Sequence, residues 1–193
     1  MSGGQLDGML SPLLRRIRLN AARPYVFGRV LDWGCGNGDL CSFVPQEQYV
    51  GVDVDESILR MARAAYPSAT FYTLSAFRPS ELFDTVAALA VIEHLPNPSG
   101  FLSHMKSLLR PGGRIVLTTP NPALDWVHGV GAKFGIFAKE SHAEHQSLMT
   151  RPKLADAAED AGLKMIRFER FLVGANQLAV LQGRHREDRR RPG

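Results

Sequence analysis

The stretch VLDWGCGNGDL, residues 30–40, decides the fold: an apolar run that includes Asp32 leads into three alternating glycines, Gly34, Gly36 and Gly38. This pattern is typical of a buried strand followed by a tight turn. Glycine adopts positive φ and lets a ligand approach the backbone without meeting a Cβ. Such turns bind several kinds of nucleotide and nucleoside cofactor, so the residues around this one have to distinguish between them.

The spacing of the glycines favours a ligand that carries a positive charge. Dinucleotide folds use G-x-G-x-x-G, which brings a pyrophosphate to a helix N-terminus. This turn has G-x-G-x-G instead, with Asp32 two residues before the first glycine. A carboxylate repels a nearby pyrophosphate but attracts a cation such as the amino group of an amino acid. The phosphate-binding pattern G-x-x-x-x-G-K-[ST] does not occur in the sequence.

A second carboxylate ends the next apolar stretch. The segment YVGVDVD, residues 49–55, places Asp53 at the carboxyl end of a predicted strand. An acidic residue at that point can accept hydrogen bonds from both hydroxyls of a ribose. Asp32 and Asp53 together indicate a ligand with an amino-acid end and a nucleoside end. S-adenosyl-L-methionine, which becomes S-adenosyl-L-homocysteine after methyl transfer, has this form.

Length and composition are those of one globular domain. The chain has 193 residues, 45% of them hydrophobic and 22% charged, with a net charge of +4. Much of the excess charge lies at the two ends, and we expect the polar tail 184–193 to be disordered because it cannot bury apolar surface. Two cysteines cannot form a disulfide framework. No apolar run has the length of a membrane span or a signal peptide, so we expect a cytoplasmic protein.

Strands and helices are expected to alternate along the chain. A helix is predicted over 11–22, with Ser11 as its N-cap and Pro12 at its first position. Further helices are predicted after Asp55 or Ser57 and after Thr150, which act as N-caps. The other predicted elements are strands at 28–33, 48–54, 69–74, 82–92, 114–119, 163–172 and 176–182, and helices at 38–44 and 98–110.

This order predicts a doubly wound α/β domain over residues 1–183. Strands that are nearly continuous in apolar residues and alternate with helices form a parallel sheet covered on both faces. The last two strands have no helix between them, so they are expected to pair antiparallel at one edge of the sheet. The ligand is expected outside the carboxyl ends of the strands.

Five stretches, in order and spacing, resemble the motifs of the class I S-adenosylmethionine-dependent methyltransferases. They are VLDWGCGNGDL, YVGVDVDESIL, FDTVAALAVIEHL, LLRPGGRIVLTTPN and EHQSLMTRPKLADAAEDAGLKMI. The match extends over about residues 28–182. The resemblance implies a Rossmann-like sheet of seven strands, mostly parallel, with the last strand antiparallel.

The resemblance also implies which residues bind the methionine half of the cofactor. Asp32, Gly34 and Gly36 would line this half, with Cys35 contributing its backbone N–H. Arg18 resembles an upstream arginine that some relatives use for the cofactor carboxylate. Gly38 is either a cofactor contact or a residue that packs between helix and strand.

The nucleoside half is assigned by the same comparison. Asp53 would hold the ribose, Val54 would flank the adenine, and Leu89 at the end of the fourth strand would pass under the sulfonium. Relatives often carry an acidic residue after the third strand for the adenine amino group, and this chain does not. Adenine recognition is therefore expected from Ser75 or from the backbone of Ala76 and Phe77.

The segment IEHL, which follows the fourth strand, offers Glu93 and His94 as residues that could act on the acceptor. The candidate catalytic residues are His94 there, and His142 and His145 in the long segment 119–149. Segments of this length without regular structure usually serve as lids or binding elements, so we expect this one to contact the methyl acceptor. Two histidines and Glu144 also have spacing that suits a metal, but no wider ligand cluster accompanies them, and no metal site is predicted.

We expect a small-molecule, sugar-containing or lipid-linked acceptor, methylated on oxygen by in-line displacement. The segment ALAVIEHL does not resemble the Asn/Asp-Pro-Pro-aromatic signature of enzymes that methylate nucleic-acid amino groups. Peripheral membrane contact is compatible with this expectation. Three alternatives remain: a nucleic-acid or protein methyltransferase that uses the basic ends, a non-catalytic cofactor-binding module, and a nicotinamide dehydrogenase.

Overall fold

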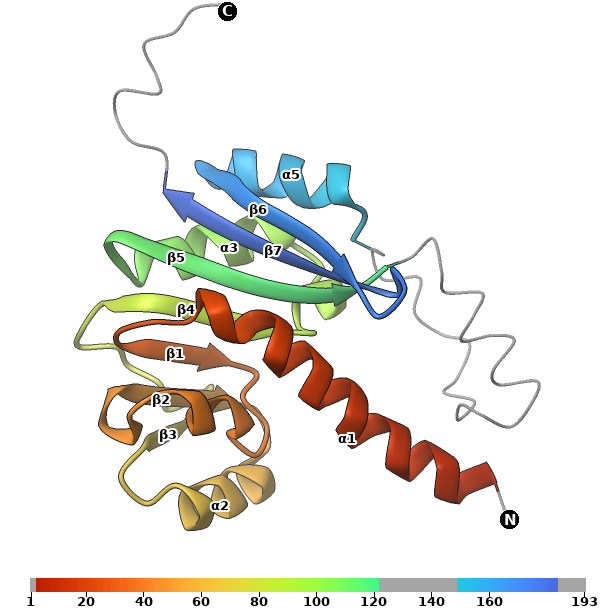
Figure 1. Cartoon of the computed structure of the whole chain (residues 1–193). Coiled ribbons are helices and arrows are strands. Elements are labelled where there is room, and N and C mark those ends of the chain that lie inside the picture. Colours follow the sequence, from red (N-terminus) through yellow and green to blue (C-terminus); the bar gives the residue numbers. More distant parts are fainter. Residues whose placement is uncertain (1–2, 122–148, 184–193) are drawn as a thin grey trace, which may run out of the picture.

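A computed structural model describes residues 3–121 and 149–183 as one seven-stranded sheet with helices on both faces (Figure 1). The strand order is β3-β2-β1-β4-β5-β7-β6. The strands are β1 (Val30–Trp33), β2 (Tyr49–Asp53), β3 (Thr70–Thr73), β4 (Phe83–Leu89), β5 (Leu109–Pro120), β6 (Leu163–Phe171) and β7 (Asn176–Gly183). The helices are α1 (Gly3–Ala22), α2 (Glu56–Ala65), α3 (Pro98–Ser107) and α5 (Arg151–Asp160), with short 3-10 helices at Arg23–Tyr25, Asp39–Phe43, Gln46–Gln48 and Ile92–His94.

Strand β7 runs against all the other strands, which confirms the expected mostly parallel sheet with its last strand reversed. It pairs antiparallel with β5 on one side and with β6 on the other. The expected antiparallel pairing of the last two strands is therefore present, and β6 forms the edge. Because β7 is reversed, its first residue, Asn176, lies beside Pro120 at the carboxyl end of β5.

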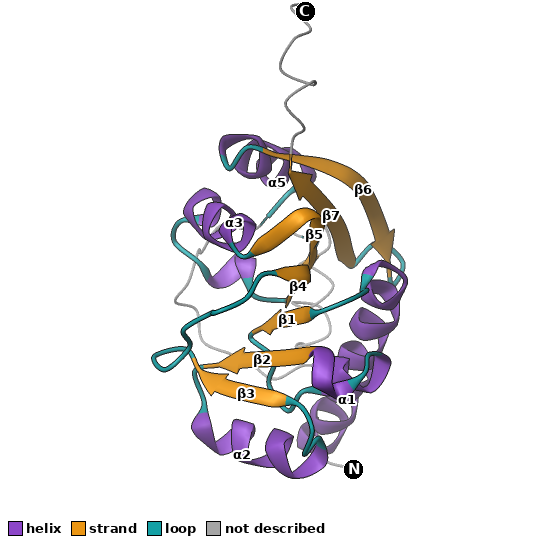
Figure 2. Ribbon diagram, turned by 90° about the vertical axis from the view of Figure 1, so that its left-hand side faces the viewer, coloured by secondary structure: helices purple, strands orange, loops and turns teal. Residues whose placement is uncertain are grey.

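The two faces of the sheet are buried by different helices. Figure 2 shows α3 and α5 on one face and α1 on the other. Alternate residues of β1 follow this division: Leu31 packs in the core that includes residues of α3 and α5, whereas Val30 packs with Leu19 of α1. Side chains alternate between faces along a strand, so Asp32 points to the same side as Val30, toward α1.

Three helix boundaries follow from local sequence signals. Asp55 caps α2 by accepting a hydrogen bond from the Ser57 backbone N–H at 2.8 Å, and Thr150 caps α5 through the Lys153 N–H at 3.4 Å. Gly162 follows α5 with a φ of 66°, a left-handed conformation that suits glycine at a helix end. The two caps confirm the predicted starts of α2 and α5, and Gly162 marks the end of α5.

Two predicted helix boundaries are wrong, and one strand is shorter than predicted. Helix α1 begins at Gly3, so Ser11 is not its N-cap and Pro12 lies inside the helix. A proline there removes one backbone donor without ending the helix. The strand predicted over 82–92 ends at Leu89, and Ile92–His94 forms a 3-10 helix. Helix α3 ends at Ser107, before the predicted end at residue 110. Strand β5 then starts at Leu109, because Leu109 pairs with Phe83 ahead of a register shift.

No helix in the described ranges is long and apolar enough to cross a membrane. Most of the predicted acceptor segment 119–149 and the whole tail 184–193 lie outside the described residues. The first two residues of that segment, Thr119 and Pro120, belong to β5, where they pair with Gln177 and Asn176 of β7.

Candidate functional site

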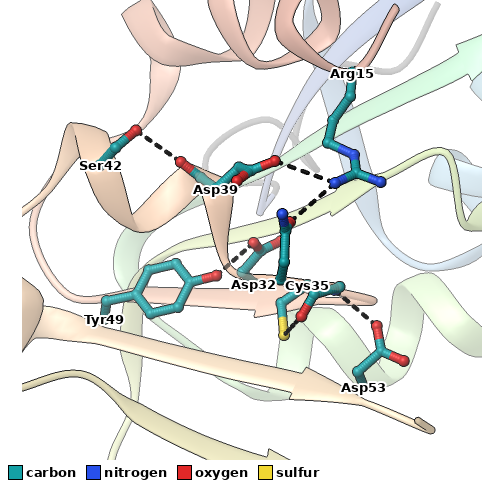
Figure 3. Close-up of polar contacts among 9 residues, drawn as sticks. Arg15, Asp32, Cys35, Asp39, Ser42, Tyr49 and Asp53 are labelled. Carbon is teal, nitrogen blue, oxygen red and sulfur yellow. Dashed lines mark hydrogen bonds and ion pairs between the residues drawn. The ribbon is translucent and has the colours of Figure 1, made fainter. Parts of the chain in front are cut away.

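A cavity of about 240 Å³ opens at the carboxyl end of β1, between the glycine turn and α1. Its wall combines a buried carboxyl group, two arginines of α1 and the backbone of the glycine turn. Figure 3 shows the carboxyl group, Asp32, and one of the arginines, Arg15. The residues that line it are Arg15, Arg18, Leu19, Asp32, Gly34, Cys35, Gly36, Asn37, Asp39, Leu40 and Leu89. Six of the ten residues expected to bind the cofactor therefore surround one cavity: Arg18, Asp32, Gly34, Cys35, Gly36 and Leu89.

Backbone hydrogen bonds fix the glycine turn to the neighbouring strand. The N–H groups of Gly34 and Cys35 both donate to the carbonyl of Val52, at 2.8 and 3.1 Å. The Gly36 N–H donates to Oδ2 of Asp53 at 2.8 Å. Because all three donors are already used inside the protein, the Cys35 N–H expected to meet the cofactor is held by β2. The turn is thus in place before any ligand binds.

The three glycines of the turn have different roles. All have positive φ, between 53° and 79°. A Cβ on Gly34 would lie 2.7 Å from Cγ2 of Val91, and one on Gly38 would lie 2.9 Å from the Phe71 ring. A Cβ on Gly36 would meet nothing within 4 Å. Gly36 therefore faces open space suited to a ligand, whereas Gly38 has the packing role that was one of its two expected roles.

Asp32 is a buried carboxyl group, 4% exposed. The Tyr49 hydroxyl donates to its Oδ2 at 2.6 Å. Burial raises the pKa of Asp32 to about 7, the Tyr49 hydrogen bond opposes this shift, and the charges of Asp53 and Asp39 add to it. A cation beside Asp32 would favour the ionised form. The amino group of an amino acid in the cavity would supply such a charge.

Asp53 links the turn to the nucleoside side of the site. Its Oδ2 accepts from Gly36, and its Oδ1 accepts from the Asp55 N–H at 3.1 Å. A carboxylate has about four lone-pair sites, so two remain for the hydroxyls of a ribose. The neighbouring Val54 is 77% exposed and offers an apolar surface next to these sites.

Two arginines of α1 reach opposite sides of the cavity. Arg15 donates from Nη1 to Asn37 Oδ1 at 3.1 Å and pairs with Asp39 at 3.3 Å, which ties the helix to the glycine turn (Figure 3). Arg18 donates from Nε to Asn176 Oδ1 at 2.9 Å, which ties the helix to β7. Residues three apart lie on one helical face, so a single turn of α1 spans the cavity.

The end of β4 has a strained backbone. Ala90, which directly follows Leu89, has a φ of 59°, an unusual value for a residue with a Cβ. Its N–H donates to the Thr118 carbonyl of β5 at 2.8 Å, which holds this conformation. Strain of this kind concentrates at functional sites. It occurs here at the point where the chain was expected to pass under the sulfonium.

The expected adenine contacts are only partly compatible with the structure. The Ala76 N–H donates to the Thr73 carbonyl at 3.0 Å, so it is not free to recognise adenine. Ser75 is exposed, and its hydroxyl lies 3.2 Å from that of Thr73. Neither Ser75 nor Ala76 lines the cavity, and its lining does not include Asp53 or Val54. The Phe77 N–H also donates to the Thr73 carbonyl, at 3.0 Å, so of the expected contacts the N–H groups are occupied, and the Ser75 side chain and the Ala76 carbonyl stay predictions.

Cys35 has the properties of a packed, unreactive thiol. Burial raises its pKa above the ordinary value for cysteine, and the charges of Asp32 and Asp53 raise it further. The thiolate is the nucleophilic form, so this thiol is not activated at neutral pH. Its Sγ contacts the Gly36 carbonyl at 3.6 Å.

The candidate catalytic residues differ in placement. His94 is exposed and does not line the cavity, whereas the adjacent Glu93 is buried. Burial raises the pKa of Glu93, while His94 and Arg18 oppose the shift. His142 and His145 lie outside the described residues. Among the described residues, no group of three or more histidine, cysteine or acidic side chains could hold a metal.

Tyr49 and Asn176 were not identified as site residues from the sequence. Five residues that line the cavity were not identified either: Arg15, Leu19, Asn37, Asp39 and Leu40. Tyr49 pairs in register with Val30, which is on the Asp32 side of the sheet, so the strand register could have found it. Glu93 was singled out together with His94, but only the histidine was chosen as a candidate. Asn176 is 158 residues from Arg18 in the chain, and no local signal connects the two.

Comparison with known proteins identifies the class. Residues 6–167 match the family described as Methyltransferase domain. The chain is 30% identical over 181 residues to a ubiquinone biosynthesis O-methyltransferase of Idiomarina loihiensis, covering 83% of this chain and 74% of that protein. It is 31% identical to a protein of the same name from Xanthomonas euvesicatoria, covering 82% and 74%. The chain therefore belongs to the methyltransferase domain family, and the expected enzyme class is confirmed.

Solved structures share the fold. An S-adenosylmethionine-dependent methyltransferase from Mesorhizobium loti has a TM-score of 0.64 at 19% identity, covering 84% of this chain and 94% of that one. The magnesium protoporphyrin IX methyltransferase of Synechocystis, solved with bound S-adenosylhomocysteine, has a TM-score of 0.61 at 21% identity, covering 94% and 83%. These neighbours confirm the Rossmann-like architecture.

The buried Asp32 predicts a specific pH dependence of stability. Its pKa is raised from 3.8 to about 7 in the folded protein, so its contribution to stability is complete below pH 3.8 and is lost as pH rises through 7. We expect the unfolding free energy of the wild type, relative to Asp32→Asn, to fall between pH 5 and pH 8. Urea unfolding of both proteins at several pH values measures this. A difference that does not change with pH would contradict it.

Proposed function

We propose that this protein transfers the methyl group of S-adenosyl-L-methionine to a hydroxyl group of a small molecule. The observation that carries the proposal is the pairing of opposite charges around one cavity. Asp32 supplies a carboxyl group and Arg18 a guanidinium, and both line the space beside Gly36. The amino-acid end of the cofactor carries an ammonium and a carboxylate, so each of its charges has a partner of opposite sign.

The nucleoside end fits the adjacent strand. The two free lone-pair sites of Asp53 accept the ribose hydroxyls, and the exposed side chain of Val54 lies against the adenine. The sulfonium then lies near Leu89 and the strained Ala90. In-line displacement from this position needs alignment and exclusion of water more than it needs covalent help from the protein.

Oxygen is the proposed acceptor atom because two relatives with about 30% identity are named O-methyltransferases. A hydroxyl must lose its proton as it gains the methyl group, and a carboxyl group with a raised pKa suits this task. Glu93 is such a group: it is buried, and burial raises its pKa. His94, His142 and His145 remain the catalytic candidates proposed from the sequence. The cytoplasmic location also remains a proposal.

Cofactor binding is tested by calorimetric titration with S-adenosylhomocysteine. We expect Asp53→Ala to weaken binding by roughly 100-fold, because two hydrogen bonds to a charged group are lost. Asp55→Ala is the matched control, since it removes a carboxylate two residues away that caps α2. It should lower stability by about 1 kcal/mol and leave the affinity unchanged. Unreduced binding by Asp53→Ala, or binding of NADH instead, would overturn the assignment.

The acceptor atom is tested with matched small molecules and cofactor labelled in its methyl group. We expect transfer to catechol and phenol scaffolds, and none to the corresponding anilines or to RNA and protein. Mass spectrometry of the product identifies the methylated atom. Label recovered only on nitrogen, or only in macromolecules, would favour the alternative of a nucleic-acid or protein methyltransferase. Binding of the cofactor without transfer to any compound in an extract would favour a non-catalytic module.

A further inference from the structure

The reversed strand β7 brings a buried amide next to Arg18, one of the residues that line the cavity. Asn176 is the first residue of β7 and is 2% exposed. Its backbone is held on both sides, because it pairs with Pro120 of β5 and with Phe171 of β6. A residue fixed by two neighbouring strands has little freedom to move. Its side chain therefore starts from a rigid backbone at the carboxyl ends of the parallel strands, where the cavity opens.

That amide is bonded to one specific atom of Arg18. Asn176 Oδ1 accepts from Arg18 Nε at 2.9 Å. Among the described residues this is the hydrogen bond that Arg18 makes, and it leaves both terminal nitrogens, Nη1 and Nη2, for a ligand. Arg18 lines the cavity, where a carboxylate can take both nitrogens in parallel.

The surroundings of Arg18 keep its charge in place. Burial lowers the pKa of Arg18, and the charge of Glu93 counters this shift. A guanidinium remains protonated under these conditions, so the group is a permanent cation. A free arginine side chain would lose rotamer freedom on binding a carboxylate, and holding it beforehand reduces that cost.

We propose that Asn176 is a positioning residue for the cofactor. It holds Arg18 at Nε, so that Nη1 and Nη2 face the cavity and bind the carboxylate of the amino-acid end. The reversal of β7 is what makes this possible, since only a strand of that direction has its first residue at this edge. The inference rests on the proposed function, because it assumes that S-adenosylmethionine occupies the cavity.

The test compares two ligands that differ only at the amino-acid end. S-adenosylhomocysteine carries the carboxylate, and 5′-methylthioadenosine has the same adenosyl and sulfur groups without it. We expect Asn176→Leu to weaken S-adenosylhomocysteine binding about tenfold in calorimetry and to leave methylthioadenosine binding unchanged. Asn176→Asp keeps an acceptor oxygen for Nε and should restore most of the affinity.

Two further variants separate positioning from general destabilisation. Gln177→Ala alters the next buried residue of β7, whose amide donates to the carbonyls of Pro120 and Met149 and not to Arg18. It should leave the affinity ratio of the two ligands unchanged. Arg18→Lys keeps the charge but removes the Nε bond together with the paired terminal nitrogens, so it tests the carboxylate contact itself and should lose S-adenosylhomocysteine affinity. If Asn176→Leu does not fold, Asn176→Ser, which also takes the amide away from Nε, is used in its place with the same expected result.

The possible results are distinguishable. Equal weakening of both ligands by Asn176→Leu would overturn the inference, as would unchanged S-adenosylhomocysteine binding by that variant or by Arg18→Lys. In either case, the proposed function still holds if the wild type binds S-adenosylhomocysteine. A wild type that binds neither ligand would overturn the proposed function together with the inference.

Discussion

The site depends on one hydrogen bond, from the Gly36 N–H to the carboxylate of Asp53. This bond joins the turn after β1 to the end of β2, and it sets the separation between the place for an amino-acid group and the place for a ribose. Its geometry requires a positive φ at Gly36 and open space where a Cβ would stand. A side chain at that position would be strained and would project into the space left for the ligand.

The second constraint comes from elements far apart in the chain. Helix α1 crosses the carboxyl edge of the sheet and is tied to the glycine turn by Arg15 and to β7 by Arg18. The cavity is lined by the glycine turn, by α1 and by the ends of β1 and β4, and β7 acts on it through the bond to Arg18. The carboxyl group of Asp32 and the guanidinium of Arg18 face it from different segments, which gives it a direction for a zwitterionic ligand.

The sequence predicted those features whose causes are local. Asp32 and Asp53 follow apolar runs that form strands, and Asp55 and Thr150 cap helices within three residues of themselves. Features set by tertiary contacts were not predicted, such as the Asn176 amide at Arg18. The helix start at Ser11 was wrong because a serine-proline pair suits an N-terminus but also occurs within a helix. The turn that occupies the Ala76 N–H, through the Thr73 carbonyl, was not predicted either.

A crystal structure of the wild type with S-adenosylhomocysteine tests most directly how the cavity holds its ligand. We expect the ribose hydroxyls on Asp53, the amino group beside Asp32, and the carboxylate on the terminal nitrogens of Arg18. The Gly36–Asp53 hydrogen bond should persist in the complex. Density for the ligand elsewhere on the sheet, or a reversed ligand with adenine between α1 and Asp32, would contradict this binding mode.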